Sequence, residues 1–185
     1  MRKLFCVMLF SLIIVLSGCS GEKKNKGFLD EFKGSDSYTI VTTVQVPIFG
    51  KMESINKVDG DKEYVSSIDG EYYISKENGT TYKYVKNGET WSKETYVEDE
   101  EDDEKVNPAE FKNEWFKKED DKYILKEEHY EDVFGEEYED VRKFEITVND
   151  NQIKIDFEVS SEGFLLEGNI VIKNLGSTTV ELPKL

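Results

Sequence analysis

Cysteine and histidine are scarce in this sequence of 185 residues. It has two cysteines and one histidine, and both cysteines, Cys6 and Cys19, lie near the N-terminus. The rest of the chain can therefore form no disulfide and no cysteine-based metal site or nucleophile. A zinc site takes about three protein ligands, usually His or Cys. His129 cannot supply them alone, and its acidic neighbours predict a solvated side chain rather than a catalytic one.

Short catalytic motifs are absent as well. The sequence contains no Gly-x-Ser-x-Gly elbow and no Walker or Rossmann glycine pattern. Carboxylates are so numerous that no glycosidase-like pair stands out among them. An unrecognised hydrolase is the remaining enzymatic alternative. The sequence predicts a protein that is not an enzyme, with no catalytic residues, no metal and no dissociable cofactor.

Positive charge is in deficit. There are 24 Lys and Arg residues against 40 Asp and Glu residues, which gives a net charge of −16. Such a surface repels nucleic acid and anionic headgroups, so no nucleic-acid partner is expected. A cationic partner or divalent ions fit the charge better. The acidic run from Glu98 to Glu104 predicts a solvated loop, because it lacks the glycine and the ligand spacing of a calcium loop.

Long apolar runs are missing except at the start of the chain. Arg2 and Lys3 precede an uncharged run that ends at Leu16. The run is too short for a membrane-spanning helix, which needs roughly 20 residues. A positive head, a short apolar body and small residues at the exit predict a secretory signal peptide over residues 1–18.

The exit of this run, Leu16-Ser17-Gly18-Cys19, resembles the lipobox of bacterial lipoproteins. The resemblance implies cleavage between Gly18 and Cys19 and a covalent diacylglycerol or palmitate group on the Cys19 thiol. We therefore expect a lipid-anchored protein on the extracytoplasmic face of the cell membrane. The alternative is an ordinary signal peptide that happens to contain a cysteine. Residues 19–27 are expected to form the lipidated cysteine and a flexible tether, and residues 28–185 a single β-rich domain.

Turn signals organise the first half of that domain. Asx-Gly pairs recur at nearly even spacing between short strand-like segments, and such pairs supply the positive φ of tight hairpin turns. They predict an antiparallel meander from Ser37 to Tyr96. Alternation of apolar and charged residues predicts further strands over 144–148 and 153–159, and apolar residues in phase at 164, 166, 170 and 172 predict another. A last strand is expected over 178–182. The four pairs are Asp59-Gly60, Asp69-Gly70, Asn78-Gly79 and Asn87-Gly88.

Helical signals are few. Phe28, Leu29 and Phe32 predict a short helix that stops at Gly34. A second helix is expected from Asn107 and Pro108, where an Asn-x-x-Glu capping box precedes an aromatic face made by Phe111, Trp115 and Phe116. Those aromatics either close the β core or form a lid over an apolar groove. Residues 127–141 are compatible with a helix or a loop.

This layout resembles the LolA/LolB/LppX group of lipoprotein carriers. The resemblance is carried by the order of elements, by the Tyr-rich hairpin segment EYYISKENGTTYKYVKNGETWSKE (71–94) and by the final TTVELPKL (178–185). It implies a mainly β fold with a few helices, in which a curved antiparallel sheet forms an unclosed half-barrel capped by helices.

The same resemblance implies a membrane-anchored protein that binds or carries an apolar, lipid-like ligand in the half-barrel, with Phe111, Trp115 and Phe116 as candidate lid residues. The expected interior departs from the group because it mixes Tyr and Thr with aliphatic residues. The alternative is therefore a structural or protein-binding module of the cell envelope with a filled core, whose acidic surface meets a cationic protein or wall polymer.

Overall fold

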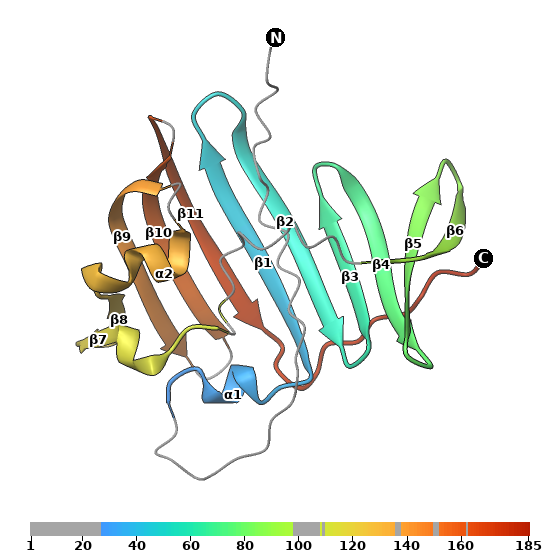
Figure 1. The fold of residues 1–185 in the computed structure, drawn as a ribbon, viewed down its shortest axis with the longest axis horizontal. Helices are drawn as coiled ribbons and strands as arrows, with labels where there is room; N and C mark the ends of the chain where they lie inside the picture. The colour runs from blue at the N-terminus through green and yellow to red at the C-terminus, as the bar shows by residue number, and fades with distance from the viewer. Residues whose placement is uncertain (1–26, 98–107, 109, 136–137, 150–151, 162) are drawn as a thin grey trace.

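The structure is a computed structural model that describes residues 27–97, 108, 110–135, 138–149, 152–161 and 163–185. The signal peptide, Cys19, most of the tether and the acidic run at 98–104 lie outside these residues. The described chain forms one antiparallel sheet of 11 strands that does not close on itself, in the order β6-β5-β4-β3-β2-β1-β11-β10-β9-β8-β7 (Figure 1). The predicted fold class, mainly β with an unclosed antiparallel sheet and a few helices, is confirmed.

The strands follow the alternation expected from the sequence. Hairpins connect β1 to β6 in turn and β9 to β11 in turn, and β1 pairs with β11 to join the two sets. The strands are β1 (Ser37–Val46), β2 (Gly50–Asp59), β3 (Lys62–Ser67), β4 (Gly70–Glu77), β5 (Thr80–Asn87), β6 (Thr90–Thr95), β7 (Phe116–Glu119), β8 (Lys122–Leu125), β9 (Tyr138–Asn149), β10 (Gln152–Ser161) and β11 (Phe164–Lys173).

The four Asx-Gly turns behave as predicted. All four glycines have positive φ, a conformation that costs glycine no steric strain. At Asn78-Gly79 both residues do so, at 52° and 81°, as a type I′ hairpin turn requires. Turn chemistry therefore fixes the register of the meander locally.

Helices cover only one part of one face of the sheet. We call the face that carries Tyr38 and Ile40 the inner face, because Phe32 of α1 (Asp30–Lys33) packs on Tyr38 with ring centroids 5.1 Å apart. Helix α1 ends at Gly34, as predicted. Helix α2 (Tyr130–Phe134) also lies on this face, in front of the β9 to β11 half of the sheet (Figure 1). The undecided segment 127–141 is thus a 3₁₀ turn, Glu127–His129, followed by α2 and the start of β9.

The predicted second helix is wrong. Asn107 lies outside the described residues, Pro108 is in a turn, and the segment then forms only a 3₁₀ turn, η2 (Asn113–Trp115), before it continues into β7. The Trp115 carbonyl accepts a hydrogen bond from the Lys126 amide, at 3.0 Å. Pairing with β8 and its continuation replaces the helical hydrogen bonds that the capping signal favoured.

The predicted last strand over residues 178–182 is also wrong. After β11 the chain crosses the outer face, opposite α1, as an extended segment outside the ladder. The Thr178 and Thr39 hydroxyls lie 2.9 Å apart, and the Val180 amide donates to the Asp59 carboxylate at 3.0 Å. The Thr39 and Asp59 side chains and the burial of Val180 hold the segment in place. Its alternating sequence pattern therefore reflects one buried side, not pairing with a strand.

Candidate functional site

The three aromatic residues predicted to form a lid come together on the inner face. The ring centroids of Phe111 and Trp115 are 6.4 Å apart, and those of Phe111 and Phe116 are 5.8 Å apart. Phe111 also packs edge-on against Phe144 of β9 at 5.7 Å. Their exposed fractions are 2%, 8% and 7% for Phe111, Trp115 and Phe116. We call Phe111, Trp115, Phe116, Phe134 and Phe144 the aromatic layer.

Neighbouring elements fix the aromatic layer from both sides. The Lys33 ammonium at the end of α1 donates a hydrogen bond to the Phe111 carbonyl, and burial lowers the pKa of Lys33. On the other side the His129 ring stacks on Trp115 with centroids 5.5 Å apart. These contacts are typical of a core. Of the two interpretations of the aromatic residues, the geometry favours closure of the β core.

His129 is more enclosed than its acidic sequence context suggested. Its side chain is 23% exposed, and its Nδ1 atom lies 2.7 Å from the Asp132 carboxylate. The His129 side chain is therefore less solvated than expected, because one face of its ring stacks on Trp115. Within the described ranges no group of three or more His, Cys, Asp or Glu side chains is placed to hold a metal ion.

The inner face continues beyond the aromatic layer onto strands β2 to β4. Met52, Val65 and Ile74 are buried side chains of this face that do not belong to the core cluster around the aromatic layer. Two buried polar residues, Asn56 and Glu63, lie on the same face. The Asn56 side-chain amide donates a hydrogen bond to the Glu63 carboxylate at 2.8 Å. This part of the face is thus a mixed surface, apolar with a buried polar pair.

Tyr38 brings a second polar group to the inner face. The residue is fully buried, and its hydroxyl has no hydrogen-bond partner in the part of the chain that the structure describes. Burial, reinforced by the negative charge of Glu63, raises the pKa of the Tyr38 hydroxyl. The group therefore stays neutral across the ordinary pH range.

Removing this hydroxyl is expected to be harmless. We expect Tyr38→Phe to leave the free energy of unfolding unchanged or to raise it by up to about 1 kcal/mol, because an unsatisfied buried hydroxyl is itself costly. Tyr84→Phe is the matched control. It removes a hydroxyl that donates to Glu77 at 3.1 Å, and should lower the free energy of unfolding by about 1 kcal/mol. Urea unfolding of both variants tests this, and a clear loss of stability in Tyr38→Phe would contradict it.

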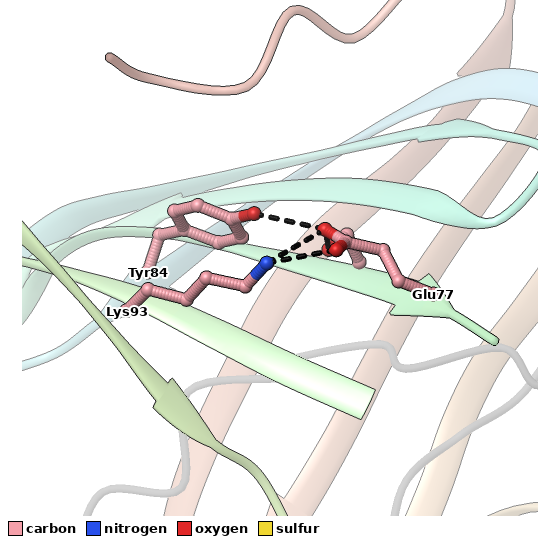
Figure 2. A network of polar contacts seen from close by, with 4 residues as sticks. Glu77, Tyr84 and Lys93 are labelled. Atoms are coloured by element: carbon pink, nitrogen blue, oxygen red, sulfur yellow. Dashed lines mark hydrogen bonds and ion pairs between the residues drawn. The ribbon is translucent and has the colours of Figure 1, made fainter. Parts of the chain in front are cut away.

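The outer face of β4 to β6 carries a polar network that the sequence did not reveal. Glu77 accepts hydrogen bonds from the Lys93 ammonium at 2.8 Å, from the Tyr84 hydroxyl at 3.1 Å and from the Ser75 hydroxyl at 2.9 Å (Figure 2). The Lys93 ammonium also lies 4.0 Å from the centre of the Tyr82 ring. The alternation of the strands could have placed these side chains on one face, but their pairing depends on cross-strand register.

This network should make stability depend on pH in the acid range. Hydrogen bonds, first from Lys93, lower the pKa of Glu77, and a bond from Lys122 does the same for Glu145. The folded state thus holds fewer protons than the unfolded state, so stability is lost as the pH falls below about 5. We expect Glu77→Gln to flatten the fall in melting temperature between about pH 5 and pH 3. Glu94→Gln, on the opposite face of β6, is the control, and equal flattening in both variants would count against the network.

The predicted anchor is not tested by the fold. Gly18 and Cys19 lie outside the described residues, so the signal cleavage and the lipid attachment stay predictions. Among the residues that the structure describes, neither helix has the length and apolarity needed to span a membrane. No protein-family model matches the chain, and a search of curated proteins finds no similar sequence.

Proposed function

We propose that this protein is a membrane-anchored lipoprotein that binds an apolar, lipid-like ligand against the inner face of its open sheet, and that it is not an enzyme. The anchor is the lipid on Cys19, which would hold the domain on the extracytoplasmic face. This is the function that the resemblance of the sequence to lipoprotein carriers implies. The proposal rests on the presence of two groups of apolar side chains on the inner face, the core cluster around the aromatic layer and the residues outside that cluster.

The observation that carries the proposal is that the inner face has buried apolar side chains outside the core cluster formed around the aromatic layer. The aromatic layer, α1 and α2 close the half made by β1 and β9 to β11. Met52, Val65 and Ile74 continue the same face outside that cluster. These three side chains are at most 9% exposed, so they offer a water-shielded apolar surface, and an apolar molecule gains free energy by leaving water for such a surface. We propose that a lipid-like ligand lies along these side chains.

Native mass spectrometry of the unlipidated protein, followed by organic extraction, tests the ligand. We expect a co-purifying acyl lipid or another apolar molecule, and Ile74→Ser should lower its occupancy. Ile55→Ser is the matched control, because Ile55 lies on the outer face of β2. A protein that is free of ligand and stays so after incubation with lipid would overturn the proposal.

The anchor has a separate test. Radioactive palmitate should label the full-length protein in cells, and Cys19→Ser should abolish the label. Label retained in Cys19→Ser would refute lipidation at that residue. Because the two tests are independent, the ligand and the anchor can fail separately.

The second candidate is an envelope module with a filled core, which binds a cationic protein or wall polymer through its acidic surface. It is favoured by the burial of Phe111, Trp115 and Phe116, since the residues expected to form a lid serve as core. Electrostatic binding of this kind weakens with salt. Recovery of a partner from envelope extract should therefore fall between low and high salt, and a salt-independent partner would count against this candidate.

A further inference from the structure

Two adjacent hairpin turns expose large apolar side chains at one end of the sheet. Ile48 and Phe49, between β1 and β2, are 73% and 63% exposed, and Ile68, between β3 and β4, is 66% exposed. We call these three residues the apolar tips. Strand β2 pairs with β3 with Ile55 opposite Ser66, so the turn that carries Ile68 is set back from Phe49 by about four residues along the sheet. Figure 1 shows both turns at the upper end of the sheet, the β1–β2 turn higher, whereas α1 lies at the lower end.

Turn geometry does not require apolar residues at these positions. Val46 pairs with Gly50, and Ser67 pairs with Gly70, so the tips occupy the apex of each loop. Glycine occupies the positive-φ position in both loops, with φ of 80° at Gly50 and 125° at Gly70. Any polar residue would suit the apex as well or better. Large apolar residues exposed at neighbouring turns of one end of the sheet indicate a contact surface.

We propose that the apolar tips insert into a lipid bilayer. A hairpin apex is convex and narrow, so it can enter the boundary between headgroups and acyl chains, whereas it cannot enclose a small molecule. At 63–73% exposed, the three side chains together offer roughly a few hundred Å² of apolar surface, less than the roughly 800 Å² per partner of a standard protein interface. The area therefore favours shallow insertion over a stable protein complex.

Local charge indicates which lipids the tips accept. The chain carries a net charge of −16 and is expected to avoid anionic membranes. At the tips themselves one positive residue, Lys51, and one negative residue, Asp69, are both exposed. The tips are thus close to neutral, and a zwitterionic bilayer is the surface that fits them.

The position of the tips indicates that this bilayer is not the one that holds the anchor, a step that rests on the proposed lipid at Cys19. The chain enters the domain at Gly27, beside α1 and at the end opposite the tips. From Cys19 to Gly27 a fully extended chain reaches roughly 29 Å at most. Strand β1, with its 10 residues, alone spans about 33 Å. The tips therefore point toward a second, facing lipid surface.

Vesicle flotation tests the insertion. Residues 19–185 carrying Cys19→Ser are mixed with phosphatidylcholine vesicles, and we expect the protein to float with them. The triple change Ile48→Ser, Phe49→Ser and Ile68→Ser should reduce the bound fraction at least tenfold without changing the melting temperature. Leu185→Ser is the matched control, because Leu185 is an equally exposed aliphatic residue, at 74%, away from the tips.

Each outcome decides one step. Failure of the unchanged tips to bind, or equal binding by the triple variant, overturns the insertion. Cross-linking of the tips to an envelope protein, with no vesicle binding, would replace the lipid by a protein surface. The lipidated protein in one vesicle population should bridge to a second population, and its failure to do so overturns the facing surface.

These results can be separated from those on the proposed function. The triple variant should keep any ligand found by native mass spectrometry, because the apolar tips lie outside the inner face. Loss of both ligand and vesicle binding in the triple variant would show that the two sites are not independent and would overturn the assignment of the tips.

Discussion

Replacing Phe111 with alanine is expected to lower the free energy of unfolding by about 3–5 kcal/mol, the usual cost of emptying a buried aromatic site. Phe111 is 2% exposed and contacts Trp115, Phe116 and Phe144. None of these rings can move to fill the space, because sheet pairing or packing holds each of them. The melting temperature should fall by roughly 6–20 °C for a domain of this size.

The matched control for Phe111→Ala is Phe49→Ala. It removes the same atoms from a residue that is 63% exposed, and its effect should stay within about 0.5 kcal/mol. Calorimetry or urea unfolding compares the two. A small loss in Phe111→Ala together with a strong loss of ligand would restore the interpretation of Phe111 as a lid residue.

The second large effect is expected at Gly168, in the middle of β11. A Cβ atom at this position would lie 2.5 Å from the Phe157 ring and 2.5 Å from the Thr43 carbonyl oxygen. Gly168 pairs with Val44 on one side and with Phe157 on the other, so it lies where the two sets of hairpins join. We expect Gly168→Ala to cost about 1–3 kcal/mol and Gly168→Val more, because a side chain there overpacks the sheet.

A double-mutant cycle separates the two clashes at Gly168. Phe157→Leu shortens the side chain and should recover part of the loss in Gly168→Ala, but the clash with the Thr43 carbonyl would remain. Gly34→Ala is the control. There the nearest atom to a new Cβ is the Asp30 carbonyl oxygen at 3.1 Å, and φ is −90°. If Gly168→Ala were as mild as Gly34→Ala, the close approach of the strands would be refuted.

The two candidate functions make opposite demands on the inner face. A ligand carrier needs Met52, Val65 and Ile74 to contact a bound molecule, whereas a filled module needs only the packing of the aromatic layer. The Asn56–Glu63 pair on the same face shows that any ligand there meets a polar group as well as apolar ones. The apolar tips are common to both candidates, since they lie at the end of the sheet.

Patterns of neighbouring residues were enough to predict much of the fold. Alternation identified strands such as β10, and Asx-Gly pairs such as Asn78-Gly79 located the hairpins, because both signals act through the local backbone. Glycine also ended α1 at the expected residue. The rings of Phe111, Trp115 and Phe116 lie together, although the helix expected to carry them does not form.

By itself the sequence determined the meander, the final hairpins, the short first helix and the grouping of apolar residues on one face. The tertiary structure decided whatever depended on distant partners. Pairing with β8 drew residues 116–119 into a strand, and the Thr39 and Asp59 side chains held residues 178–180 outside the sheet. It also decided that β1 meets β11 and that Ile48 and Ile68 lie at one end. Long-range pairing is set by the free energy of the whole sheet, which no local pattern encodes.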